Sequence, residues 1–159
     1  MLVFPDALKV DDDSVNRFVT HAMTVCASGR YEAFRLLWSA REEPLPRGEY
    51  ERGWQAVQRI RVRLVQKIKL AGRKGEASNA AAPQVAYVVC AAVHLDTSLL
   101  AGRRKPDRNV VVLVLQEQGE WRLARAPAKV RKWVKARLEA SATTSDGPAT
   151  TDSDMGNDS

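Results

Sequence analysis

RIRVRLVQKIKL, residues 59–70, is the stretch of sequence that decides the fold of this chain. Arginines alternate with aliphatic residues from Arg59 to Leu64, which is the two-residue period of a strand with one buried face. The period then slips by one residue, because Leu64 and Val65 are adjacent apolar residues and the lysines that follow alternate in the new phase. A slip of this kind is typical of a β-bulge, which bends a strand. We therefore predict a long strand in a curved sheet.

Three more strands are predicted downstream. Residues 84–96 alternate with both faces largely apolar, and residues 109–116 contain an almost unbroken aliphatic run. The turn at Gln118–Gly119 precedes a last strand that ends before Pro127. Residues 71–83, rich in Gly, Ala and Ser, are predicted to form a long hairpin loop. Strands that are apolar on both faces need cover on both sides, either from a helix or from a second subunit.

Helices are predicted before and after these strands. Residues 14–28 place apolar side chains at the three-and-four spacing of an amphipathic helix, with Asp13 or Ser14 as its N-cap. Shorter helices are expected over 31–40 and 48–58, and another follows Pro127 with a stripe made of Val130, Trp133, Val134 and Leu138. The predicted fold is α+β: three N-terminal helices packed on a curved four-stranded antiparallel sheet, plus a C-terminal helix.

Length and composition favour one domain, and the chain has 159 residues. We expect residues 1–139 to form this domain and residues 140–159 to be a disordered acidic tail. The tail holds four aspartates and no Lys or Arg, so residues 1–139, with 25 basic and 15 acidic residues, carry +10. No apolar stretch is long enough to span a bilayer, and no basic leader precedes the acidic run at residues 11–13. A cytoplasmic location is expected, with Cys26 and Cys90 as reduced core residues.

A glycine turn followed by a tryptophan strand, Gly119-Glu120-Trp121-Arg122-Leu123, ends the predicted meander. With three leading helices and a bulged antiparallel sheet, this order resembles the nuclear transport factor 2-like (cystatin-like cone) superfamily over roughly residues 14–126. A short hairpin that many members insert before the third helix has no counterpart in residues 41–47. The chain therefore resembles the trimmed variants found in small bacterial proteins. The resemblance implies no particular reaction, because most such domains bind, dimerise or assist other proteins.

The leading functional hypothesis is a non-catalytic binding or assembly domain with a small, mainly apolar pocket. Its candidate ligand-binding residues are Trp38, Tyr50, Trp54 and Tyr87, although aromatic residues at such spacing also pack as ordinary core. The domain is expected to form a homodimer through one face of the third predicted strand, made of Val110, Val112 and Val114 or of Val111, Leu113 and Leu115.

An enzyme is the first alternative. His94 and Asp96 stand two residues apart on a strand, so their side chains share a face, and a carboxylate beside an imidazole suits general acid–base chemistry. His21, at the edge of the first helix's apolar stripe, is a further candidate. The reaction would be that of a cofactor-free isomerase, dehydratase or cyclase. The competing interpretation is that these polar residues simply end a strand near solvent.

Polyanion binding is the second alternative, since a basic sheet face could attract nucleic acid. Its candidate residues are Arg59, Arg61, Arg63, Lys67 and Lys69. Against it stands the absence of an RNA-binding aromatic motif or a recognition helix. No cofactor is predicted, and no metal site, because the two histidines and two cysteines lack ligand spacing.

Overall fold

The computed structural model of the protein describes residues 1–54, 57–70, 84–96 and 107–141. The predicted hairpin loop at 71–83 and nearly all of the predicted acidic tail lie outside the described residues. The chain divides into two compact units, Met1–Ala126 and Pro127–Ser159, which are described separately below.

The first unit is built on a mixed sheet with strand order β1-β2-β3-β4-β5. The strands are β1 (Leu2–Val3), β2 (Val57–Leu70), β3 (Gln84–Leu95), β4 (Asp107–Glu117) and β5 (Glu120–Arg125). Strands β2 to β5 form the predicted antiparallel meander, and β1 adds a fifth strand, parallel to β2. The α+β class is confirmed. The sheet differs from the prediction because a two-residue strand is too short to leave a periodic signal in the sequence.

Strand β2 carries two register shifts against β3. One falls between Val57 and Arg59 and the other between Val62 and Leu64, so that Arg63 has no partner on β3. The predicted bulge is therefore present, slightly earlier than the adjacent apolar pair suggested. Before the bulge even-numbered residues point to one face of the sheet, and after it odd-numbered residues point to that same face.

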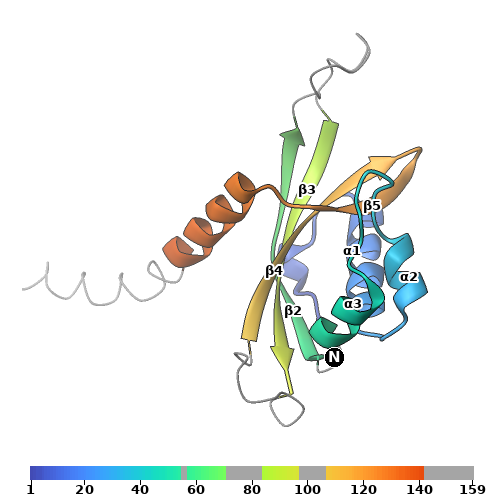
Figure 1. The fold of residues 1–159 in the computed structure, drawn as a ribbon. Helices are drawn as coiled ribbons and strands as arrows, with labels where there is room; N and C mark the ends of the chain where they lie inside the picture. The colour runs from blue at the N-terminus through green and yellow to red at the C-terminus, as the bar shows by residue number, and fades with distance from the viewer. Residues whose placement is uncertain (55–56, 71–83, 97–106, 142–159) are drawn as a thin grey trace, which may run out of the picture. The chain divides into compact units, whose positions relative to one another are not determined.

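Three helices cover one face of the sheet: α1 (Asp13–Cys26), α2 (Tyr31–Leu36) and α3 (Arg47–Trp54) (Figure 1). We call this the helix face and the opposite side the second face. Helix α1 begins after Asp12, whose carboxylate accepts a hydrogen bond of 3.0 Å from the Ser14 N–H, so the N-cap is one residue earlier than predicted. Helix α2 ends sooner than predicted because the residues after it bond to β5.

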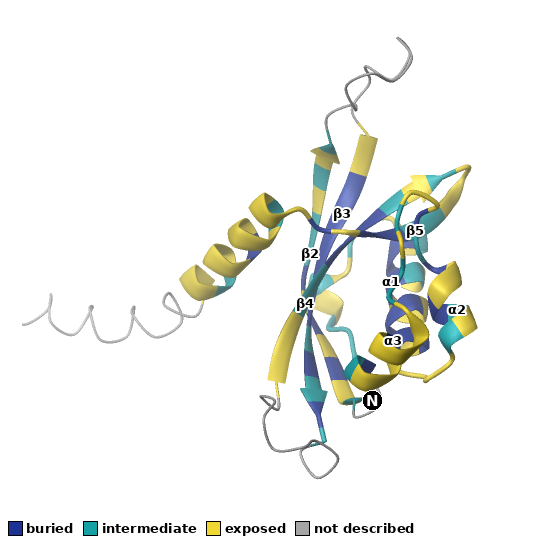
Figure 2. Ribbon diagram, in the orientation of Figure 1, coloured by how far each residue is buried: buried dark blue, intermediate teal, exposed yellow. Residues whose placement is uncertain are grey.

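The core lies between α1–α3 and the helix face of the sheet. Strand β3 contributes alternate residues from Tyr87 to Leu95, and most of that strand is buried (Figure 2). Helix α1 buries the predicted apolar stripe except Phe18, which is only half-buried. Cys26 and Cys90 are both free and buried, which confirms their predicted role as core residues.

Asn16 is a buried polar residue that the apolar pattern of α1 did not single out. Its side-chain oxygen accepts a hydrogen bond of 2.9 Å from the Val10 N–H, and its amide donates one of 2.8 Å to the Val10 carbonyl. This reciprocal pair satisfies both backbone groups of Val10 and holds the segment that precedes α1 against the helix.

The second unit contains a helix over residues 128–141. It extends to the last described residue, whereas disorder was expected from residue 140. Within the described part of the chain, no helix is long and apolar enough to cross a membrane.

Replacing Asn16 with leucine is expected to lower the free energy of unfolding by about 1 to 3 kcal/mol, because the Val10 N–H and carbonyl lose their partners. Thr24→Ala is the control. It removes an exposed helix hydroxyl bonded to the Thr20 carbonyl, and it should cost about 0.5 kcal/mol or less. Urea unfolding measures both variants, and equal losses would contradict the role given to Asn16.

Candidate functional site

Two open hollows adjoin each other along α2 and the β4–β5 hairpin, and together we call them the α2 groove. The first has a volume of about 610 Å³ and is lined mainly by α2, the segment 38–44 and the hairpin. The second, of about 550 Å³, is lined by α1, α2 and the hairpin. Both are lined by Leu36 and Arg122, so these two side chains stand where the hollows meet.

Leu36 is the most unusual residue of the groove, because its side chain is large, apolar and 70% exposed. It is the last residue of α2, and its neighbour Leu37 turns into the core. The groove therefore has an exposed, large apolar side chain at the place where its two hollows meet.

Tryptophans line both hollows. Trp121 lines the second hollow, where its indole N–H donates a hydrogen bond of 2.9 Å to the Ser14 hydroxyl. Trp38 lines the first hollow and packs edge-on against Phe34, with ring centroids 5.8 Å apart. The Trp38 Nε1 atom is buried and finds no hydrogen-bond partner among the described residues. A buried indole N–H without a partner costs free energy of folding.

The outer edge of β5 is closed by the chain itself. The Leu123 N–H donates a hydrogen bond of 2.7 Å to the Leu37 carbonyl, and the Ser39 N–H donates one of 2.7 Å to the Leu123 carbonyl. Further along, the Glu42 carboxylate accepts a hydrogen bond of 3.1 Å from the Arg125 N–H. These contacts occupy the edge, so a ligand in the groove meets side chains rather than free strand backbone.

Glu117 holds the segment after α2 against the hairpin. Its carboxylate accepts a hydrogen bond from the Ser39 hydroxyl and another of 3.0 Å from the Ala40 N–H. The hydrogen bond from Ser39, above all, lowers the pKa of Glu117. Ser39 is buried, so this bond fixes the floor of the first hollow.

Charge around the first hollow is mixed, with three glutamates and two arginines in its lining. The arginines already have acidic neighbours: Arg35 pairs with Glu32 at 3.0 Å, and Arg122 with Glu120 at 2.5 Å. Glu43 is exposed, and within the described residues its carboxylate forms no ion pair. The Arg125 guanidinium lies close by, donating a hydrogen bond of 2.8 Å to the Glu43 main-chain carbonyl.

The predicted ligand-binding aromatics do not gather around one cavity. Tyr50, Trp54 and Tyr87 are buried in the core between the helices and the sheet, and none of them lines either hollow. Trp38 alone of the four lines a hollow, on the outer side of α2. Within this core the Phe34 and Tyr50 rings pack against each other, with centroids 4.3 Å apart.

Tyr50 has a structural role at the end of α1. Its hydroxyl donates a hydrogen bond of 2.9 Å to the Cys26 carbonyl and accepts one of 3.1 Å from the Gly29 N–H. It thus satisfies backbone groups that the end of a helix leaves open. Burial raises the pKa of Tyr50, and burial also raises the pKa of the Cys26 thiol to about 12.

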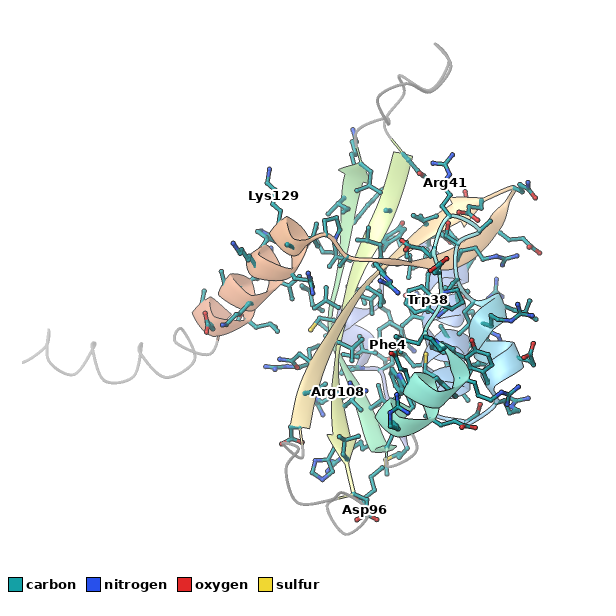
Figure 3. The ribbon with its side chains drawn as sticks, viewed as in Figure 1. Phe4, Trp38, Arg41, Asp96, Arg108 and Lys129 are labelled. Carbon is teal, nitrogen blue, oxygen red and sulfur yellow. The ribbon has the colours of Figure 1, made fainter. Side chains whose placement is uncertain are left out.

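The catalytic candidates are placed apart. His94 pairs with Arg59 of β2 on the second face, and its Nδ1 contacts the carboxylate of Asp107 rather than Asp96. Asp96 lies just beyond the end of β3 that is remote from the β4–β5 hairpin (Figure 3). His21 is exposed on α1 and lines the second hollow on the helix face. Among the described residues no cluster of three or more His, Cys, Asp or Glu could hold a metal ion.

The basic candidates of β2 do not share a face. Arg61 pairs with Ala92, on the second face, whereas Lys67 pairs with Tyr87, whose ring lies in the core of the helix face. Arg59 accordingly lies with Arg61, and Lys69 with Lys67. All five side chains are exposed. Because the bulge at Arg63 places the two sets on opposite faces of the sheet, they form no single basic surface.

The two alternative dimer sets of β4 are distinguished by their faces. Val112 and Val114 belong to the core of the helix face, and Val110 packs beside it. The other set, Val111, Leu113 and Leu115, pairs with Cys90, Val88 and Ala86 on the second face. On this second face Leu113 is already buried in the single chain, at 4% exposed, and Val111 and Leu115 are half-buried.

Sequence reasoning missed the α2 groove. Leu36 stood outside the apolar stripe of its helix, and Ser39 and Glu117 are ordinary polar residues separated by 78 positions. The mismatch of a leucine on the polar side of α2 was the one available signal. No family model matches the chain, and no curated protein or solved structure matches it.

Tyr50→Phe is expected to lower the free energy of unfolding by about 1 to 3 kcal/mol, because the buried Cys26 carbonyl and Gly29 N–H lose their partner. Tyr31→Phe is the matched control. It removes one half-buried hydrogen bond, to the Leu45 carbonyl, and should cost about 1 kcal/mol or less. Thermal and urea unfolding test the pair. If Tyr50→Phe were neutral, the hydroxyl would have no role in ending α1.

Glu117→Gln is expected to change how stability depends on pH. The pKa of Glu117 is lowered in the folded protein, so its contribution is fully present above the ordinary glutamate range and is lost as the pH falls through the lowered value. The difference in unfolding free energy between wild type and variant should therefore be constant near neutrality and shrink in acid. Urea titrations across this range measure it, with Glu120→Gln as the exposed control. A difference that grows in acid would contradict the assignment.

Proposed function

We propose that this chain is a non-catalytic docking domain that binds an extended segment of a partner protein in the α2 groove. The observation that carries the proposal is the exposure of Leu36 between two hollows that both reach it. The partner segment would place a bulky apolar side chain against Leu36 and the tryptophan walls. A nearby Lys or Arg of that segment would face Glu43, an exposed carboxylate of the first hollow that forms no ion pair within the described residues.

Several contacts make the groove a stable surface rather than a gap in the packing. The Glu117 hydrogen bonds hold the segment after α2 against the β4–β5 hairpin, and the pairing of residues 37–39 with Leu123 fixes the same segment to β5. Because β5 already has its edge occupied, recognition would depend on inserted side chains instead of strand addition. A pre-formed site of this kind loses little conformational entropy on binding.

We also infer that the first unit is a nuclear transport factor 2-like cone. Three helices over one face of a bulged meander, and the closing strand with Trp121, support this assignment. The parallel strand β1 is an addition to the expected pattern. In that superfamily a docking role is ordinary, and homodimerisation through the second face of β4 stays a prediction.

Leu36→Asp tests the docking proposal. A library of displayed peptides is selected on the full chain and sequenced, and the binding of individual peptides is measured by fluorescence anisotropy. Selected peptides should share an apolar residue next to a basic one. Leu36→Asp should lower the affinity for the selected peptides by more than about tenfold, because the contact at the centre of the site is lost. Glu43→Gln should lower the affinity for the peptides only a few-fold and make peptide binding less dependent on salt.

Val85→Asp is the matched control, since Val85 is also an exposed aliphatic residue, at 37%, and lines neither hollow. It should leave peptide binding unchanged while circular dichroism confirms that both variants are folded. Selected peptides without a shared pattern, or peptides that bind the Leu36→Asp variant as well as wild type, would refute the proposal.

A further inference from the structure

The helix over residues 128–141 has two distinct rows of side chains along its length. Residues four apart lie one above another on a helix, so Val130, Val134 and Leu138 form one row and Lys129, Trp133 and Arg137 form another. Val134 is only 1% exposed, while Trp133 is 40% exposed. In the first row Val134 is buried and Val130 and Leu138 are half-buried, whereas the row with Trp133, which we call the Trp133 row, is exposed along its length.

Positive charge dominates this helix. It contains five cations, Lys129, Arg131, Lys132, Lys135 and Arg137, against one acid, Glu139. All five cations are exposed, and Figure 3 shows Lys129 projecting from the first turn of the helix. For Lys129, Arg131 and Lys132, the described part of the chain contains no ion-pair partner. Their charge is available to a ligand.

Within the Trp133 row an aromatic ring stands between two cations. The Arg137 guanidinium lies 5.5 Å from the centroid of the Trp133 ring, and Lys129 stands one turn away on the other side. The three residues extend over about 12 Å of helix, given a rise of 1.5 Å per residue. A flat π-face between two phosphate-binding cations is the combination that single-stranded nucleic acids use, with a base on the ring and phosphates on the cations.

We propose that the Trp133 row binds single-stranded nucleic acid through stacking on Trp133 and phosphate contacts from Lys129 and Arg137. A lipid surface would suit the charge as well, but a helix that lies in a bilayer needs a free apolar face. Here Val134 is buried and Val130 and Leu138 are half-buried, and among the described residues of the helix Trp133 is the only large apolar side chain that is exposed. This surface shares no residue with the α2 groove or with the basic candidates of β2.

Fluorescence anisotropy of a short, labelled, mixed-sequence oligonucleotide with the full-length protein tests the proposal. Binding should weaken steeply between about 50 and 200 mM salt, because condensed counterions are released. Trp133→Ala should reduce affinity about tenfold through lost stacking, and Trp133→Phe should retain most of it. Circular dichroism shows whether the helix persists in both variants.

The double variant Lys129→Gln/Arg137→Gln should lower both the affinity and the slope against salt, by about 0.7 in the slope for each lost phosphate contact. Arg59→Gln/Arg61→Gln is the matched control, with the same change in net charge on β2, and it should leave stacking-dependent binding nearly intact. Three results would overturn the proposal: no salt-dependent binding, equal losses from both double variants, or binding to anionic phosphatidylserine vesicles without binding to the oligonucleotide.

Discussion

The phase of β2 is the constraint on which the rest of the first unit depends. A strand shows alternate residues to opposite faces, and the unpaired Arg63 changes that alternation part-way along. Ile60 and Val62 enter the core before the bulge, and Val65 packs beside it afterwards. The bulge lets one strand bend around the helices and still supply apolar residues to them. It also divides the basic residues of β2 between two faces.

Closure of the β5 edge and formation of the groove have the same physical cause. Residues 37–39 leave the helical pattern after α2 because their backbone groups bond to Leu123. That turn brings Leu37 into the core and leaves Leu36 in solvent. Edge protection, which keeps a sheet from pairing with other chains, therefore creates a shaped surface beside the hairpin. The groove therefore results from the need to cover the edge of β5.

Buried hydroxyl and amide groups give the packing its specificity. Tyr50 ends α1, Asn16 holds the segment that precedes it, and Ser39 joins two segments distant in sequence. Each of them satisfies backbone or carboxylate groups that would otherwise be unpaired inside the protein. In the sequence Tyr50 looks like a ligand-binding aromatic residue, but in the structure its hydroxyl hydrogen-bonds to backbone groups at the end of α1.

Periodicity determined the elements by itself: the α1 stripe, the antiparallel meander, the bulge in β2 and the helix after Pro127 all follow from local patterns, because those patterns record burial on one face. Tertiary structure alone decided β1, the early end of α2 and the placing of His94 with Asp107. It also decided that Tyr50 is core and that Leu36 lies where two hollows meet. These features depend on hydrogen bonds and packing between residues far apart in the chain, and such pairings leave no period in the sequence to read.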